Sequence, residues 1–251
     1  KYCNKKKITF LSTAYDQDSA ILLNKLKIPA FKIASTDNDN YPFISFMKKF
    51  NKPIILSTAM STFEEVKFAY RLLKKNNFEK FSIMQCTGSY PTKIENTNLN
   101  VIDQYKKNFK CPIGFSDHTE GSTAAICAVA KHIKIIEKHF TISKKLNGPD
   151  HRMSLEPKEL IEYIKSIRLA EKSLGMKNKQ ILLSEKENKK KLKKSLVAKR
   201  FIKKGQKISR NLIDIKRPGN GIRPKDIKKV LGKKTNCNIK ENTILNINML
   251  Y

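Results

Sequence analysis

Short apolar runs alternate with longer amphipathic segments along much of the chain. The runs are rich in β-branched and aromatic residues and occur at residues 8–12, 31–35, 53–57, 81–86, 112–116 and 134–140. Between them, apolar residues recur at helical spacing, as at 62–75 with Phe63, Val66, Ala69 and Leu73, and a further helix is predicted at 156–174. This alternation is typical of repeated βα units and a parallel sheet.

The predicted strands all end in polar or small residues. The ends read STAYD, STDND, STAM, CTGSYP, SDHTEG and EKHFT. In a (β/α)8 barrel the functional groups lie at the carboxyl ends of the strands, so this succession predicts an active-site rim. A barrel needs eight strands, because six leave two unpaired edges and an open core. We therefore expect two further βα units before residue 1.

The pattern changes after residue 180. A dense lysine run, KENKKKLKK, is followed by short strand-like pieces such as SLVAKRFI and TILNINML, with KKGQ and PGNG turns. The fold class predicted is α/β, with six strands of a (β/α)8 TIM barrel over residues 1–180. A Lys-rich linker over 181–193 and a small β-rich domain over 194–251 complete the prediction.

The formal net charge of +30 raises the question of nucleic acid as a partner. Lysines are spread along the whole chain, no arginine-rich stripe is interleaved with aromatics, and there is no Trp. This distribution favours a solvated basic surface that steers anionic substrates, without nucleic acid binding.

Composition also bears on location. No run of apolar residues is long enough to span a membrane, and the start, KYCNKKK, lacks the apolar region of a secretory signal. The five cysteines are scattered without a CxxC pair, so we expect reduced thiols. The sequence predicts a cytoplasmic protein with no membrane partner.

Two histidines end neighbouring predicted strands, His118 in SDH and His139 in EKH. A right-handed crossover places such strand ends side by side, so the two imidazoles can share one ion. Side-chain alternation adds Ser116 to the face of His118 and Glu137 to the face of His139. Two imidazoles with oxygen groups and open positions suit Mn²⁺, Fe²⁺, Co²⁺ or Zn²⁺. The alternative is that each histidine only makes local hydrogen bonds.

Other strand ends offer groups that bind anions. Lys32, Ser35, Ser57 and Ser116 end separate strands, where an ammonium, hydroxyls and loop amides can cradle a phosphate. The alternative for the lysine is that it snorkels from its strand.

Two more histidines lie outside the strand ends. His151 belongs to the rim loop NGPDHRMSLEP, in which Asp150 can accept hydrogen bonds from a polyol or stabilise a turn. His132 lies near a predicted helix end, where a structural role is expected.

In chain order, FLSTAYD, FKIAS, PIILSTAMS, QCTGSYP, IGFSDHTEG, IEKHFT, GPDHRMSLEP and KRPGNGI resemble successive motifs of the sialic acid synthases. The resemblance implies a TIM barrel followed by an antifreeze-like (SAF) domain. It also implies metal-dependent condensation of phosphoenolpyruvate with an open-chain N-acetylated aminosugar. N-acetylmannosamine or its 6-phosphate would give N-acetylneuraminate or its 9-phosphate, and phosphate. A legionaminic or pseudaminic acid synthase is the alternative, and a non-catalytic carbohydrate- or nucleic-acid-binding protein is the alternative from a different class.

The resemblance implies roles for individual residues. His118 and His139 match the metal ligands, with Mn²⁺ expected and Mg²⁺ or Co²⁺ as alternatives. Asp37 is the expected proton-transfer residue. The phosphoenolpyruvate-binding positions match a larger set: Thr13, Lys32, Ser35, Ser57 and Ser116.

Sugar contacts and assembly follow from the same resemblance. Tyr90 and Asp150 match sugar-contacting positions. Arg217 matches an arginine of the antifreeze-like domain that reaches the active site of the partner subunit, which implies a domain-swapped homodimer. Gly88 stands where other members carry a polar side chain, and an acidic residue and a lysine of the first two barrel strands do not occur here. We therefore expect the chain alone to be inactive or unstable.

Overall fold

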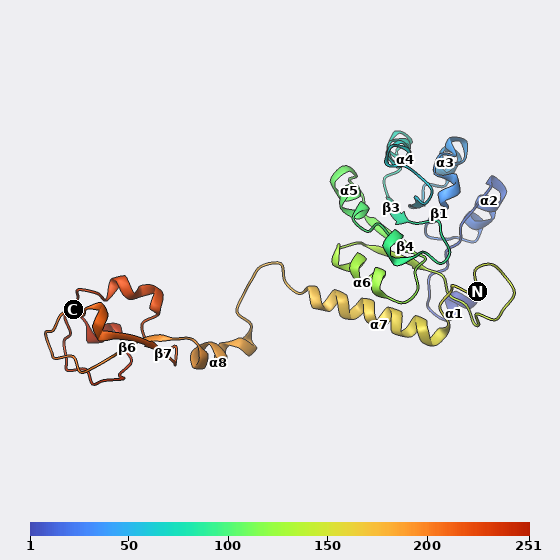
Figure 1. Cartoon of the computed structure of the whole chain (residues 1–251). Helices are drawn as coiled ribbons and strands as arrows, with labels where there is room; N and C mark the ends of the chain where they lie inside the picture. Colours follow the sequence, from blue (N-terminus) through green and yellow to red (C-terminus); the bar gives the residue numbers. More distant parts are fainter. The chain divides into compact units, whose positions relative to one another are not determined.

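The computed structural model describes all 251 residues, which form two compact units, Lys1–Gly175 and Met176–Tyr251 (Figure 1). The first unit contains a five-stranded parallel sheet whose strand order follows the chain. The strands are β1 (Phe31–Ile33), β2 (Ile54–Ser57), β3 (Phe81–Cys86), β4 (Ile113–Asp117) and β5 (Ile135–Lys138). The sheet curls as part of a barrel with helices outside it, so the predicted α/β barrel class is confirmed.

Helices lie before, between and after these strands along the chain (Figure 1). They are α1 (Tyr2–Lys5), α2 (Gln17–Lys25), α3 (Tyr41–Met47), α4 (Phe63–Lys75), α5 (Val101–Asn108), α6 (Thr123–Ala130) and α7 (Pro157–Leu174). The helix expected at 62–75 is confirmed as α4, whose start carries a capping box between Thr62 and Glu65. The helix expected at 156–174 is confirmed as α7, with Pro157 at its first turn.

The first of the six predicted strands is wrong. Residues 8–12 are not part of the sheet, and only Thr13 makes a single parallel bridge, to Lys32 of β1. Ile8 and Phe10 are 63% and 44% exposed. A strand of a parallel sheet is stabilised by burial of both faces, which this apolar run does not have in the structure.

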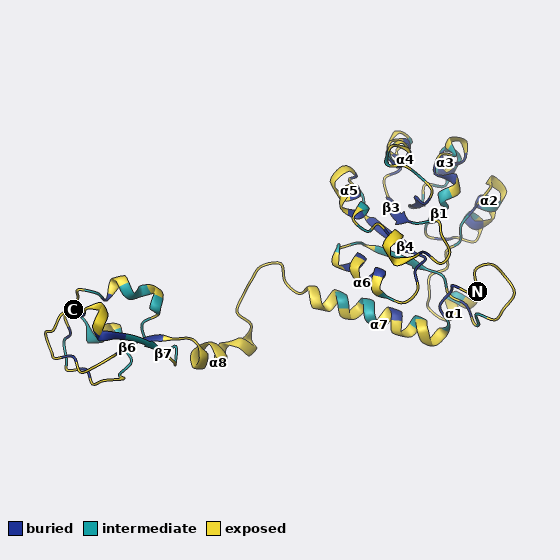
Figure 2. Ribbon diagram, viewed as in Figure 1, coloured by how far each residue is buried: buried dark blue, intermediate teal, exposed yellow.

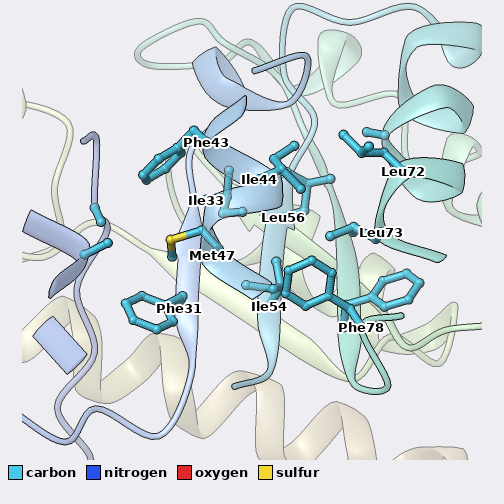
Figure 3. Close-up of a cluster of buried hydrophobic side chains, with 14 of the residues drawn as sticks. Phe31, Ile33, Phe43, Ile44, Met47, Ile54, Leu56, Leu72, Leu73 and Phe78 are labelled. Carbon is cyan, nitrogen blue, oxygen red and sulfur yellow. The ribbon is translucent and has the colours of Figure 1, made fainter. Parts of the chain in front are cut away.

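Side-chain alternation divides the sheet into two faces. On the outer face, residues such as Phe31, Ile33, Ile54 and Leu56 pack against α2, α3 and α4 in a continuous core (Figure 3). A second cluster, including Ile83 and Phe115, packs beneath α5 and α6. Figure 2 shows that burial is concentrated along the strands and on the inward sides of these helices. The alternate residues of each strand therefore face the inside of the curl.

The second unit has its own small core. Strands β6 (Ser195–Ala198) and β7 (Ile213–Lys216) pair antiparallel. Leu196, Ile202 and Val230 are among the fully buried residues of the cluster around them. The segment 181–193, expected as a linker, contains α8 (Leu183–Leu192), none of whose residues is buried.

Two further features concern the whole chain. All five cysteines are free thiols. None of the helices combines the length and apolar character that crossing a lipid bilayer requires.

Candidate active site

A cleft of about 730 Å³ opens at the carboxyl ends of the five strands. Its walls come from the inner face of the curled sheet and from the loops that follow the strands. It gathers nine of the eleven residues predicted as site residues: Thr13, Lys32, Ser35, Ser57, Tyr90, Ser116, His118, His139 and Asp150. The strand ends therefore do form one common site, as barrel geometry requires.

One side of the cleft is rich in hydroxyl groups around a single ammonium. The side chain of Lys32 is only 13% exposed, and its Nζ lies 3.3 Å from Oε2 of Glu137. Ser116 Oγ donates a hydrogen bond of 2.7 Å to Oε1 of the same carboxylate. Ser35 Oγ accepts a hydrogen bond of 2.8 Å from the backbone N–H of Ala59. These groups line the place where an anion would be held.

Ser57 differs from its neighbours in this group. Its Oγ is buried and has no hydrogen-bond partner within the protein. Leaving a buried hydroxyl unpaired costs about 1–3 kcal/mol, so such a group in a cleft points to a ligand that pairs with it.

Glu137 makes contacts in the site that its position in the sequence does not predict. Alternation along β5 predicts that it shares the face of His139, and it does line the cleft. Its carboxylate, however, contacts Lys32 of β1, at the other end of the sheet order. Only the curl of the sheet brings these two strands within reach, so no strand-neighbour rule predicts this contact.

Cys86 is a cleft residue that sequence reasoning missed. It lies on the inner face of β3, and its Sγ is 3.8 Å from Nδ1 of His118. Burial raises the pKa of the thiol above its ordinary value, which keeps it neutral. The period of two along β3, which places Met84 and Cys86 on one face, is the signal that identifies it.

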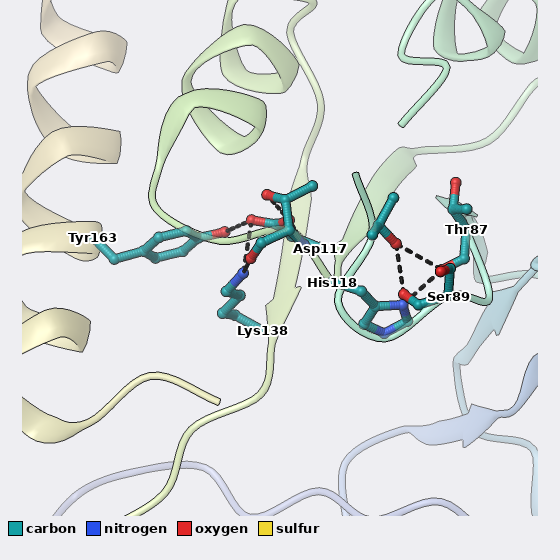
Figure 4. A network of polar contacts seen from close by, with 8 residues as sticks. Thr87, Ser89, Asp117, His118, Lys138 and Tyr163 are labelled. Carbon is teal, nitrogen blue, oxygen red and sulfur yellow. Dashed lines mark hydrogen bonds and ion pairs between the residues drawn. The ribbon is translucent and has the colours of Figure 1, made fainter. Parts of the chain in front are cut away.

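The two histidines lie together at the opposite side of the cleft. The ring centroids of His118 and His139 are 5.2 Å apart. Nδ1 of His118 lies 2.8 Å from the carbonyl oxygen of Thr87, so this nitrogen carries the proton and Nε2 keeps its lone pair (Figure 4). Burial lowers the pKa of His118, which favours the neutral ring. Nδ1 of His139 lies 4.0 Å from Oδ2 of Asp150.

These rings fit a divalent metal ion of the catalytic kind. Metal-binding histidines typically direct their second ring nitrogen to a carbonyl or a carboxylate, as His118 does to Thr87 and His139 does, at longer range, to Asp150. No group of three or more His, Cys, Asp or Glu side chains is arranged to hold a metal. A metal ion held here would have two imidazoles as its protein ligands, which would leave positions for water or substrate, unlike a closed structural zinc site.

Tyr90 forms a wall next to the histidines. Its ring centroid lies 4.2 Å from that of His118 and 5.9 Å from that of His139. Burial raises the pKa of its phenol, so the hydroxyl stays protonated. Gly88, two residues before Tyr90, does not line this cleft, and a Cβ there would lie 3.1 Å from Cγ of Met60.

Two predicted site residues lie outside the cleft. Asp37 belongs to the short 3-10 helix Ser35–Asp37, is buried, and accepts a hydrogen bond of 2.8 Å from Asn40 Nδ2. Arg217 belongs to the second unit, where it is exposed directly after β7.

The remaining histidines are held by local contacts. Nδ1 of His151 lies 2.7 Å from Oγ1 of Thr141, which ties down the rim loop that carries Asp150. His132 follows the C-cap residue of α6 with a φ of 55°, a left-handed conformation common just after helix ends, in line with the structural role expected for it.

Fold and site together define a (β/α)-barrel enzyme that collects cationic, hydroxyl and imidazole groups at its strand ends. The chain belongs to the NeuB family, whose model matches residues 1–179, and a SAF domain matches residues 193–250. The resemblance drawn from the sequence motifs is thus confirmed.

Individual relatives agree with this assignment. The chain is 40% identical to the N,N'-diacetyllegionaminic acid synthase of Campylobacter jejuni, covering 98% of this chain and 73% of the relative. It is 36% identical to the human N-acetylneuraminate-9-phosphate synthase, covering 96% and 67%. The crystal structure of the Bacillus subtilis spore coat polysaccharide biosynthesis protein SpsE is similar with a TM-score of 0.66 at 33% identity, over 100% of this chain and 75% of that chain.

Proposed function

We propose that this chain carries the catalytic barrel of a sialic-acid-type synthase, a transferase that joins phosphoenolpyruvate to an open-chain N-acetylated aminosugar. One observation carries the proposal: a single cleft places the Lys32 ammonium and several serine hydroxyls opposite two adjacent imidazoles. Such a site can hold an anionic substrate next to a centre that activates a carbonyl group.

In the proposed reaction, C3 of phosphoenolpyruvate forms a bond to the aldehyde carbon of the sugar. Water adds at C2, and phosphate leaves with cleavage of its C–O bond. Lys32 and the hydroxyls of Ser57 and Ser116 would bind the phosphate oxygens, with Thr13 and Ser35 completing the cradle. Charge-assisted hydrogen bonds of this kind hold the phosphate both before and after it leaves.

The two histidines would hold one divalent ion through their Nε2 atoms, Mn²⁺ in our proposal and Mg²⁺ or Co²⁺ as alternatives. When bound, this ion would act as a Lewis acid that polarises the aldehyde oxygen. Tyr90 and Asp150 lie beside the rings and would contact the sugar.

The proton-transfer residue has two candidates. The family resemblance implies Asp37, which lies outside the cleft, and the geometry favours Glu137, whose carboxylate is within the cleft between Lys32 and Ser116. A general acid or base must come within hydrogen-bond reach of the atom it serves, and Glu137 already lines the cleft whereas Asp37 does not.

We favour a neuraminate-type substrate because of the motifs KIASTDNDN and QCTGSYP. A diacetylated legionaminate precursor is the second candidate, because identity to the Campylobacter jejuni legionaminic acid synthase, 40%, exceeds that to the human neuraminate enzyme, 36%. Arg217 would reach the cleft of a partner subunit in a domain-swapped homodimer, which would bring a second cation to the substrates.

The test is a substrate panel on the full-length gene product. Release of phosphate from phosphoenolpyruvate is measured with N-acetylmannosamine, its 6-phosphate and 2,4-diacetamido-2,4,6-trideoxyhexoses, with and without Mn²⁺. We expect release that requires both a sugar and the ion. Release that ignores the sugar, or none with any sugar, would contradict the proposal. Tight binding of duplex DNA that survives moderate salt would favour the non-catalytic alternative.

A further inference from the structure

A buried polar cluster lies directly behind the two histidines, on the other face of the sheet. Asp117 and Lys138 precede His118 and His139, and their Cα atoms are partners in the β4–β5 ladder. Because side chains alternate along a strand, the imidazoles face the cleft while Asp117 and Lys138 face α7. Figure 4 shows Asp117 and Lys138 beside Tyr163, and His118 on the other side of the strand.

Asp117 is the centre of this cluster and is fully buried. Its Oδ1 accepts hydrogen bonds from the backbone N–H of Thr119 at 2.8 Å and from the Thr119 hydroxyl at 2.7 Å. Its Oδ2 accepts a hydrogen bond of 2.7 Å from the Tyr163 hydroxyl and lies 3.3 Å from Lys138 Nζ. The carboxylate thus joins β4, β5 and α7 while it holds the loop that continues from His118.

Lys138 closes the cluster from the next strand. Its side chain is 5% exposed, it donates to the carbonyl oxygen of Thr119, and its Nζ lies 5.4 Å from the ring centre of Tyr163. Burial lowers the pKa of the ammonium, and Asp117 opposes that shift. Tyr163 is the one buried residue of the 18-residue helix α7, so this helix meets the strands through the same cluster.

We infer that Asp117, Lys138 and Tyr163 form a positioning network that sets the spacing and orientation of the two imidazoles. The inference rests on the proposed function only in taking the imidazoles as the metal site. Each histidine follows a residue whose side chain is fixed on the far face, so its backbone has little freedom to shift. The ion pair between Asp117 and Lys138 joins β4 and β5 at residues that are partners in the ladder, which also fixes one imidazole relative to the other.

The test compares two variants with a matched control. Tyr163→Phe removes one hydrogen bond to Asp117 and keeps the ion pair. D117N/K138M removes both charges while it keeps side chains of similar shape. A double variant is used because a single change would leave one charge buried without a partner. The control is Tyr105→Phe in α5, which also removes the hydroxyl of a buried tyrosine that contacts a side chain, Thr58 at 3.0 Å, but makes no contact with β5 or α7.

Two measurements are made on the chain, each checked for folding by circular dichroism. One is the apparent Kd for Mn²⁺ together with the visible spectrum of bound Co²⁺, which reports coordination geometry. The other needs no metal: it records the imidazole ¹⁵N signals of His118 and His139 by NMR, assigned with H118Q and H139Q.

Loss of a group that orients metal-binding histidines weakens metal affinity about 10–100-fold. We expect a loss of that order, a changed Co²⁺ spectrum and displaced imidazole signals for D117N/K138M. Tyr163→Phe should change the same properties less, and Tyr105→Phe should change none.

The outcomes separate the inference from the proposed function. Unchanged imidazole signals in folded D117N/K138M overturn the positioning network whether or not a metal binds. If D117N/K138M does not fold, Tyr163→Phe decides, and signals and affinity equal to those of Tyr105→Phe overturn the inference. Displaced imidazole signals in a chain that binds no Mn²⁺ or Co²⁺ support the network and contradict the metal site of the proposed function.

Discussion

The unpaired hydroxyl of Ser57 leads to a prediction in which stability and binding change in opposite directions. Its Oγ is buried, faces the cleft and has no partner. An unsatisfied buried polar atom costs about 1–3 kcal/mol, so Ser57→Ala should stabilise the ligand-free chain by about 1 kcal/mol. For a unit of this size that is about 2–4 °C in Tm.

The same substitution should weaken the binding of phosphoenolpyruvate. If Ser57 donates to a phosphate oxygen, its removal takes away a hydrogen bond to a charged group, which contributes about 1.5–3 kcal/mol. Phosphoenolpyruvate affinity should then fall about 10- to 100-fold, measured by isothermal titration calorimetry, while denaturant unfolding shows the gain in stability.

Ser82 offers a matched control. Its Oγ is also buried without a partner, on the neighbouring strand β3, but it does not line the cleft. Ser82→Ala should raise stability in the same way and leave phosphoenolpyruvate affinity unchanged. Equal effects of the two variants on affinity, or a loss of stability in Ser57→Ala, would refute the assignment of Ser57 to the anion site.

The remaining predictions concern single groups, and those that measure activity use the full-length gene product, because the chain alone is expected to be inactive. Because burial lowers the pKa of His118 in the folded chain, the unfolded chain takes up this proton at a higher pH. Stability should therefore fall as the pH drops below about 6.5, the ordinary value for histidine, and H118Q should flatten that dependence in urea unfolding curves. Glu137→Gln should lower kcat about 100-fold or more with intact Mn²⁺ binding, and Asp37→Asn should cost less; the reverse order in steady-state kinetics would return proton transfer to Asp37. Arg217→Ala and H118Q should each be inactive alone yet regain activity when mixed, because one swapped site then carries both intact residues; no recovery after subunit exchange would contradict the swapped dimer.

Much of this site could be predicted from the chain because it depends on strand ends. Lys32, Ser57 and Ser116 each fall at the end of a buried apolar run, and parallel strands bring their carboxyl ends to one edge. His118 and His139 end consecutive strands, so crossover handedness alone makes them neighbours.

What escaped prediction depends on contacts that no local pattern encodes. The run 8–12 has strand-like residues, but a strand requires partners on its edges and cover on its faces, and neither is a property of the run itself. The contact between Lys32 and Glu137 joins the first and last strands of the sheet. It depends on how far the sheet curls, which is a property of the assembled unit.

The two tripeptides SDH and EKH are best understood as one structural unit. In the β4–β5 ladder Ser116 is paired with Glu137 and Asp117 with Lys138, and these pairs make a hydrogen bond and an ion pair on opposite faces of the sheet. A slip of β5 by one residue would move both of its polar side chains, Glu137 and Lys138, to the wrong face. It would bury Glu137 against α7 and expose Lys138 to the cleft. The polar pairs therefore specify the register that brings the two imidazoles together, which the apolar residues of β4 and β5 alone would specify less strictly.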